Sequence, residues 1–263
     1  MLVRILRPLL GPVVLLAALA APSAAVAGGW VPHIRQAIAY AQARKGEVRF
    51  AVRTERHLWG FHRTSGVHSA SVVKALLLVA YLDHPSVRGR RLRVADHRLV
   101  DPMIRRSDNR AANRVLAIVG APRVQETARR VGMRRFRLNP RVWGGSRIDA
   151  SEQTRFFLHF EAHVAARHRA TAMRLLGSIV PEQRWGIGEA RPDGWRLYFK
   201  GGWGSGAGLI DHQVALLVRG ADRVSVAVLT TGSPDHAYGK QTLRGVFARL
   251  LRGLEPQLVL TPL

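Results

Sequence analysis

A lysine at position 74 stands inside an apolar run that extends to Leu82, which predicts a helix buried on all sides. A buried ammonium group is unfavourable without a partner. Ser71 precedes Lys74 by three residues, and residues at this spacing share a helix face, so the amine should lie beside the hydroxyl. A desolvated lysine can act as a base toward a serine nucleophile, and free N–H groups at the helix start suit a developing oxyanion. The alternative is a helix-capping Ser71 with a Lys74 that extends to the surface.

The composition favours a base at position 74. The chain has 263 residues, of which 47% are hydrophobic and 22% charged, as in a globular protein with a sizeable core. It contains no cysteine, which excludes disulfides and thiolate chemistry. The formal net charge is +24, yet only four of the 41 basic residues are lysines. Because arginine does not lose its proton in proteins, a lysine in such an arginine-rich chain supports a base at this position.

Two further motifs carry residues of catalytic type. Ser-Asp-Asn at 107–109 precedes a stretch with helical spacing at 112–119, and Lys-Gly-Gly at 200–202 ends a stretch of alternating apolar residues at 195–199. Each motif has a plain structural alternative. Serine, aspartate and asparagine are favoured helix caps, and a lysine before glycines is ordinary at the end of a strand.

The order of the predicted elements indicates an α+β fold, with an antiparallel sheet built from both chain ends and a helical region inserted between them. We expect a helix after Pro32, strands at 48–53 and 58–62, a helix from Ser71 to Pro85, irregular structure at 86–100, helices at 112–119, 122–131, 151–165 and 167–177 around a long loop at 135–150, strands at 195–200, 209–218 and 224–231, and a last helix near 243–250.

The three motifs in this order resemble those of the serine penicillin-recognising family, the class A β-lactamases and D,D-peptidases. The resemblance runs from Val48 to Leu251 and implies a β-lactamase/transpeptidase-like fold. It implies a catalytic domain at 28–263, with an α/β part at 30–65 and 193–253 and a helical part at 66–192. The interval from Ser71 to Ser107 is short for class A enzymes, so the helical part must be trimmed.

The resemblance also implies residue roles in a serine hydrolase that acts on a β-lactam or a peptidoglycan-type amide. Ser71 would be the nucleophile, Lys74 its base, and Ser107 the proton relay to the leaving nitrogen. The backbone N–H groups of Ser71 and Trp203 would form the oxyanion hole. The substrate would be bound by Asn109, Lys200, Gly201, Gly202 and Trp203. The family usually has a hydroxyl residue after the lysine of the third motif, and here that residue is Gly201.

A second departure concerns hydrolysis of the acyl-enzyme. Class A β-lactamases activate water with a glutamate in an omega loop, and the matching segment here, Asn139–Asp149, contains no glutamate. Its only acid is Asp149, and Glu152 follows in the first turn of the next predicted helix, where the helix dipole alone favours a carboxylate. Without a positioned base, we expect deacylation to be slow.

The first 27 residues resemble a secretory signal peptide, with a basic start, an apolar core and a small-x-small cleavage site at 25–27. We therefore expect a secreted or periplasmic monomer with no membrane span after cleavage. As partners of the basic surface, anionic polymers of the cell envelope are favoured over nucleic acid, and the alternative is a solvated surface that only reflects the arginine-biased composition. His159 and His163 have metal-ligand spacing without an evident third ligand, so neither a metal nor a cofactor is expected. The alternative function is a catalytically silent protein that binds peptidoglycan.

Overall fold

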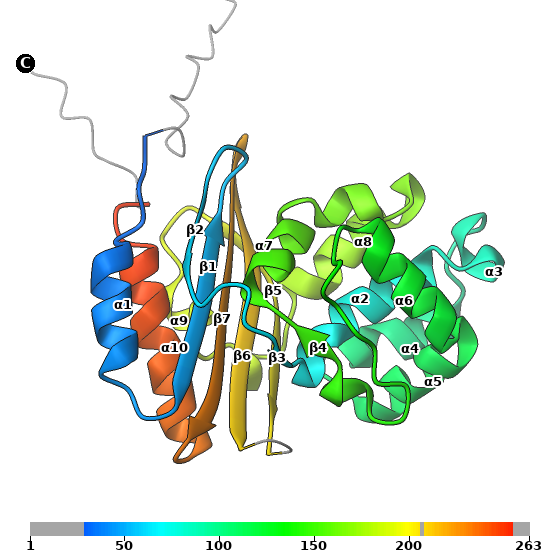
Figure 1. Cartoon of the computed structure of the whole chain (residues 1–263). Coiled ribbons are helices and arrows are strands. Elements are labelled where there is room, and N and C mark those ends of the chain that lie inside the picture. Colours follow the sequence, from blue (N-terminus) through cyan, green and yellow to red (C-terminus); the bar gives the residue numbers. More distant parts are fainter. Residues whose placement is uncertain (1–28, 206–207, 255–263) are drawn as a thin grey trace, which may run out of the picture.

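A computed structural model describes residues 29–205 and 208–254, and the predicted signal peptide lies outside these residues. Five antiparallel strands form one sheet in the order β2-β1-β7-β6-β5 (Figure 1). The strands are β1 (Glu47–Arg53), β2 (Leu58–Phe61), β5 (Arg196–Gly204), β6 (Leu209–Arg219) and β7 (Asp222–Ser233). Strands from both ends of the chain thus pair side by side, and the predicted α+β class is confirmed.

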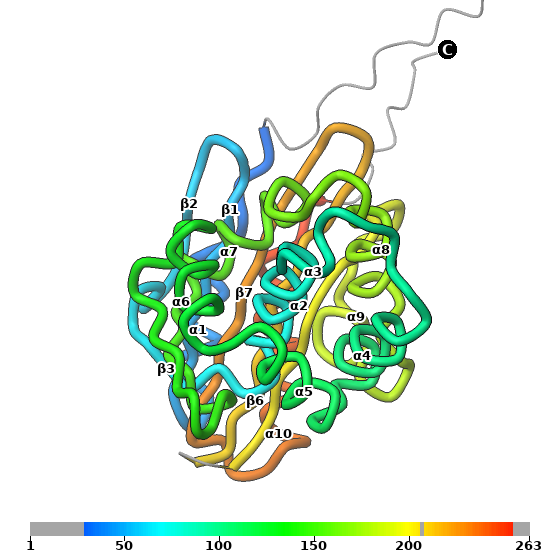
Figure 2. The backbone as a smooth tube through the Cα atoms, turned by 90° about the vertical axis from the view of Figure 1, so that its right-hand side faces the viewer, coloured from blue at the N-terminus to red at the C-terminus, as the bar shows by residue number. Residues whose placement is uncertain are grey.

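Helices cover both faces of the sheet (Figures 1 and 2). Helices α1 (Ile34–Gln42) and α10 (His236–Leu250) lie on one face, and α7 (Ala150–Leu158) packs on the other. The remaining larger helices gather beyond β5: α2 (Lys74–Leu82), α4 (Val94–Arg105), α5 (Asn109–Val119), α6 (Ala121–Arg130) and α8 (Ala166–Gly177). Among the helices of the described ranges, none is both long and apolar enough to cross a bilayer.

Several short elements join these layers. Strands β3 (Val67–His68) and β4 (Arg147–Ile148) pair with each other outside the main sheet. The short helices are α3 (Pro85–Arg88), α9 (Ile187–Ala190) and the 3₁₀ turns η2 (Ala70–Val73), η3 (Trp143–Gly145), η4 (Phe160–His163) and η5 (Pro181–Gln183).

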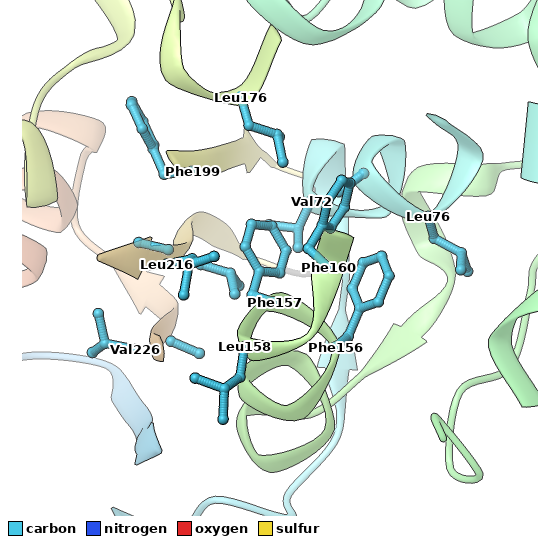
Figure 3. Close-up of a cluster of buried hydrophobic side chains, with 14 of the residues drawn as sticks. Val72, Leu76, Phe156, Phe157, Leu158, Phe160, Leu176, Phe199, Leu216 and Val226 are labelled. Atoms are coloured by element: carbon cyan, nitrogen blue, oxygen red, sulfur yellow. The ribbon is translucent and has the colours of Figure 1, made fainter. Parts of the chain in front are cut away.

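The core lies between the sheet and α7 and continues into the helical part (Figure 3). Every residue of α2 is buried, as its uniformly apolar sequence predicts. Phe156 and Phe157 of α7 meet in an edge-to-face contact with ring centroids 5.6 Å apart. Leu216 of β6 and Val72 of η2 lie near these rings, so the phenylalanines join the sheet to the turn η2 that contains Ser71.

Three sequence-based expectations are corrected. Residues 86–100 are not irregular, because α3 and α4 occupy most of them; the many arginines obscure the buried stripe that ends in Met103 and Ile104. The predicted helix at 151–165 ends at Leu158 and continues as η4. The strand expected to stop at 200–202 continues to Gly204, because each of its last residues pairs with β6.

Candidate active site

Ser71 lies in the 3₁₀ turn that leads into α2 rather than at a capped helix start. The turn is capped by Ser69, whose side chain makes no capping bond, and Ser71 is half-buried. Ala70 has φ 44°, a left-handed conformation held by the surrounding contacts. In the described parts of the chain, no hydrogen bond of the Ser71 hydroxyl is present.

Gly202 of β5 lies directly against this turn. A Cβ atom at position 202 would come within 2.7 Å of the Ser71 nitrogen and 2.8 Å of the Val72 nitrogen. Only a residue without a side chain permits this approach. The close packing places the backbone of β5 beside the Ser71 N–H, where the oxyanion hole is expected, whereas the Val72 N–H donates to the Ser69 carbonyl at 3.1 Å.

Lys74 is fully buried, which excludes the alternative of a lysine that extends to the surface. Its Nζ donates hydrogen bonds to the Ser107 carbonyl (2.5 Å), the Ser107 hydroxyl (3.2 Å) and Asn109 Oδ1 (2.7 Å). It makes none to the Ser71 hydroxyl among the described residues. Burial lowers the pKa of Lys74 to about 7, although the negative charge of Asp108 opposes this shift. A lysine with this pKa is available as a base near neutral pH.

The second motif serves both as a helix cap and as part of the site. Asp108 is the N-cap of α5, and its side chain accepts a hydrogen bond from the Ala111 N–H at 2.7 Å. Ser107, just before the cap, has φ 58°. This left-handed conformation accompanies a carbonyl and a hydroxyl that both accept from Lys74. The capping alternative is therefore correct for Asp108 and incomplete for Ser107.

Lys200 is also fully buried and approaches the same hydroxyl from the opposite side. Its Nζ donates to Ser107 Oγ at 3.1 Å and to the Gly201 carbonyl at 2.7 Å. Burial lowers the pKa of Lys200, and the nearby charge of Lys74 lowers it further. Ser107 Oγ is thus shared by two lysines, as a proton relay between them would require.

The outer side of β5 differs from what the family resemblance implies. A Cβ atom at Gly201 would meet its nearest neighbours, Gln213 and Trp185, at 3.6 Å, which is ordinary contact. Trp203 is 38% exposed and packs edge-on against Trp185 with ring centroids 6.1 Å apart. An aromatic pair therefore lies beside the strand, and position 201 has room for a Cβ atom that the sequence does not supply.

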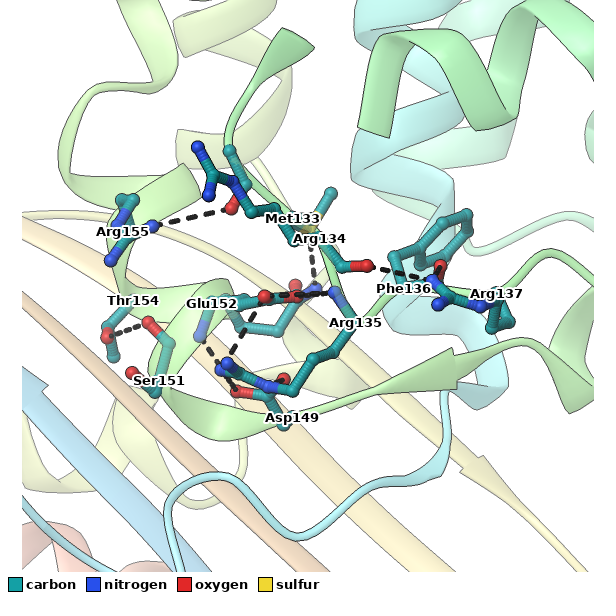
Figure 4. Close-up of polar contacts among 12 residues, drawn as sticks. Met133, Arg134, Arg135, Phe136, Arg137, Asp149, Ser151, Glu152, Thr154 and Arg155 are labelled. Carbon is teal, nitrogen blue, oxygen red and sulfur yellow. Dashed lines mark hydrogen bonds and ion pairs between the residues drawn. The ribbon is translucent and has the colours of Figure 1, made fainter. Parts of the chain in front are cut away.

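The loop that matches the omega loop is closed by a network at its two ends (Figure 4). The Arg135 guanidinium donates to both carboxylate oxygens of Asp149, at 2.9 and 3.1 Å. The Arg135 backbone N–H is shared between the two oxygens of Glu152, each at 3.0 Å. Both acids are buried, and Asp149 also caps α7 by accepting from the Glu152 N–H. The two carboxylates thus have structural partners.

Sequence analysis missed two residues that border the site. Trp143 lies in the middle of the same loop, and its ring centroid is 4.8 Å from Lys74 Nζ. Its indole N–H donates to Asn113 Oδ1 at 2.6 Å. The sequence did offer one signal for Trp143, since it is the only aromatic residue in the segment Asn139–Asp149.

The histidines considered as metal ligands lie outside this cluster. His159 Nε2 is 4.0 Å from Glu55 Oε2, and the His163 ring stacks on Phe156 with centroids 5.8 Å apart. Burial lowers the pKa of His163 to about 4. Within the described ranges, no group of three or more histidine or acidic side chains is placed to hold a metal ion. The His163 ring thus packs on α7, whereas His159 is exposed and faces Glu55.

Comparisons with known proteins identify the fold and the family. The fold is similar to that of a β-lactamase from Sphaerobacter thermophilus, with a TM-score of 0.71 at 20% identity over 82% of this chain and 95% of the other. It is also similar to the class A β-lactamase of the last common ancestor of Gram-negative bacteria, with a TM-score of 0.69 at 20% identity over 82% and 97%. No curated protein matches the sequence. The sequence profile of the β-lactamase enzyme family matches residues 86–252, well over half of the chain, and the chain therefore belongs to this family.

Proposed function

We propose that this protein is an exported serine hydrolase or acyltransferase that forms an acyl-enzyme on Ser71 with a β-lactam or a D-alanyl-type amide. The observation that carries the proposal is the chain of hydrogen bonds from Lys74 through Ser107 Oγ to Lys200. Burying two lysines around one hydroxyl lowers the stability of the fold, so a purely structural role does not explain them. The arrangement is suited to moving protons.

In the proposed acylation, Lys74 takes the proton of the Ser71 hydroxyl while Ser71 Oγ attacks the amide carbonyl carbon. The oxyanion that forms would be held by the backbone N–H groups of Ser71 and Trp203. When the C–N bond breaks, the leaving nitrogen takes the Ser107 proton, and the Lys74 ammonium replaces it. The products are an ester on Ser71 and a neutral amine. Asn109 Oδ1 is occupied by Lys74, which leaves the amide NH₂ group to donate to the substrate carbonyl.

The charges around Ser107 favour an anionic substrate. Lys74 and Lys200 lie within hydrogen-bond distance of the same oxygen, and Asp108 is the acid that acts on Lys74. A substrate carboxylate beside Lys200 would offset the repulsion between the two amines and favour the protonated form of Lys200. β-Lactams and D-alanyl peptides both carry such a carboxylate.

We expect the acyl-enzyme to be long-lived. Asp149 and Glu152 are the acids of this loop region, and both are bound to Arg135. A positioned general base ordinarily contributes about 10²–10⁴-fold to a rate. A chromogenic cephalosporin should therefore give a burst of product followed by slow turnover, in a secreted or periplasmic protein bearing the predicted signal sequence.

A labelled penicillin tests the proposal. Covalent label on the wild-type protein and none on Ser71→Ala supports an acyl-enzyme at Ser71. One observation favours the other candidate, a silent peptidoglycan-binding protein: Lys74 is hydrogen-bonded to Ser107 and Asn109 and not to Ser71. Absence of label from every penicillin and cephalosporin tried, together with binding to isolated peptidoglycan, would establish that candidate instead.

A further inference from the structure

The loop that lacks the glutamate presents an aromatic ring to the buried lysine. Among the described residues of this loop, Trp143 is the one whose side chain reaches Lys74, with 4.8 Å between Nζ and the ring centroid. The ring is half-buried, whereas Lys74 is fully buried. We infer that Trp143 is a positioning residue that shields Lys74 from water and thereby prolongs the acyl-enzyme. This inference rests on the proposed function.

The indole is fixed on the side of α5. Its N–H donates to Asn113 Oδ1 at 2.6 Å, and Asn113 lies one helical turn after Asn109, which itself binds Lys74. Two asparagines one turn apart on α5 thus hold the two groups: Asn109 binds Lys74, and Asn113 binds the indole that covers it. Rotation of the ring would break the bond to Asn113.

The backbone that carries the ring is tied to the nucleophile turn. The Ser69 hydroxyl lies 3.3 Å from the Gly144 carbonyl, and the Ser69 N–H donates to the Ser146 carbonyl at 2.7 Å. A Cβ atom at Gly144 would lie 3.7 Å from the Ala70 Cα, so the turn packs in contact with the residue before Ser71. The ring and the nucleophile are therefore held by one connected backbone.

An aromatic face and a carboxylate have opposite effects on a nearby water. A carboxylate accepts a proton from water and activates it, whereas the ring face attracts the lysine ammonium and accepts no proton. Trp143 therefore occupies the side of Lys74 toward this loop with a group that cannot act as a base. Water on this side of Lys74 would also solvate the amine, and the ring excludes that water.

The charged groups that face Lys74 are few, which makes its titration a usable probe. Lys200 approaches from β5, Asp108 from the start of α5, and Trp143 from η3 brings no charge. Burial is the main cause of the lowered pKa of Lys74. The ring also attracts the ammonium form, which by itself raises the pKa, but burial is the larger effect on Lys74. If the ring maintains that burial, its removal should therefore raise the pKa toward the ordinary value for lysine.

The decisive measurement is the NMR titration of ¹⁵N-labelled lysine side chains, because the chain has only four lysines to assign. Trp143→Ala should raise the titration midpoint of Lys74 by about one unit or more, since one unit is a modest part of the shifts that burial produces. Trp143→Phe keeps an aromatic face and should leave the midpoint close to that of the wild type. Asn113→Leu removes the acceptor of the indole N–H, and its Lys74 midpoint should lie between those of the two Trp143 variants. Trp59→Phe, far along the chain on β2, is the matched control.

The lifetime of the penicillin acyl-enzyme, followed by mass spectrometry, is the second readout. Trp143→Ala should shorten it several-fold and Trp143→Phe should not. An unshifted Lys74 titration in Trp143→Ala, with only a lower melting temperature, would overturn the inference and leave Trp143 a packing role. A shifted Lys74 titration with an unchanged acyl-enzyme lifetime would overturn the claim that Trp143 prolongs the acyl-enzyme. If the wild type takes no label, the proposed function fails, and the titration still decides whether Trp143 shields Lys74.

Discussion

Two regions border Ser71, and they differ in whether their charged side chains lie inside the site or outside it. In the lysine cluster, Lys74 and Lys200 are fully buried and both donate to Ser107 Oγ. In the loop from Arg135 to Asp149, the carboxylate and the guanidinium bind each other at the ends, and the part that approaches the site carries Trp143. The cluster thus holds two lysines around Ser107 Oγ, whereas the loop places an aromatic ring beside Lys74 and pairs its buried acids with Arg135.

The difference shows that the shape and the chemistry of this loop are set by different residues. The shape depends on the contacts of Arg135 with Asp149 and Glu152, which close the loop over the start of α7 (Figure 4). In our proposal the chemistry depends on Trp143 at the middle of the loop, which contacts Lys74 and takes no part in that closure.

Lys74→Arg should have the largest effect and would test the cluster. Arginine stays protonated and cannot take the Ser71 proton, so acylation by a labelled penicillin should fall by about 10²–10⁴-fold, the usual share of a general base. Lys200→Arg, where only a positive charge is assigned, should be milder. Circular dichroism would confirm that both variants fold. Acylation of Lys74→Arg at the wild-type rate, or equal complete losses at both positions, would contradict this division of roles.

Gly202→Ala should have the next largest effect. The added methyl group would lie 2.7 Å from the Ser71 nitrogen and must displace β5 from the nucleophile turn. Loss of one oxyanion-hole donor typically costs about 10²–10³-fold, and we expect a decrease of that order in the acylation rate. Gly201→Ala is the matched control, because its methyl group meets its neighbours at 3.6 Å. Equal effects of the two substitutions would show that the approach of β5 to Ser71 does not matter.

The pH dependence of acylation should follow the neutral amine of Lys74. Its pKa of about 7 means that the base is protonated at lower pH, so the rate should fall about tenfold for each pH unit below 6 and level off above 8. Stopped-flow measurements with a chromogenic cephalosporin would give this profile. A profile that stays flat from pH 5 to 9 would exclude Lys74 as the base. Neither the lysine cluster nor the loop would then contain an identified base.

Much of this arrangement follows from local sequence. The buried helix after Ser71 and the alternating strands have clear periodicity, and the structure brings Lys74, Ser107 and Lys200 of the three motifs together. The resemblance implies that Lys200 lies near Ser107, but contacts between distant residues outside the three motifs could not be predicted. Trp143 meets Lys74 across 69 positions of sequence only because β3 and β4 pair and bring η3 to Ala70. The bond between Lys74 and Asn109, in place of one to Ser71, likewise depends on how α5 packs against α2.

Substitutions at the loop ends should change stability and leave the chemistry unchanged. Asp149→Asn and Glu152→Gln each leave buried donors poorly matched, at a cost of about 1–3 kcal/mol. For a chain of this size, each kcal/mol lowers the melting temperature by about 2–4 °C. The deacylation rate should stay slow in both variants and in the double variant. A fast wild-type reaction that either change stops at the acyl-enzyme would identify that acid as the base.

Gly201→Ser should have the smallest effect and acts on the cluster side of the comparison. Position 201 has room for a Cβ atom, and a hydroxyl there would stand where the related enzymes help to hold the substrate carboxylate. One added hydrogen bond is worth about 0.5–1.5 kcal/mol, so the dissociation constant of a penicillin before acylation should fall by about 2–12-fold. The deacylation rate should not change, because the loop is untouched. Gly201→Ala supplies the same carbon without the hydroxyl, and an equal gain with alanine would attribute the improvement to packing against Trp185. No gain with serine would mean that Lys200 already satisfies the carboxylate, and that this departure from the family, unlike the one at Trp143, costs the site nothing.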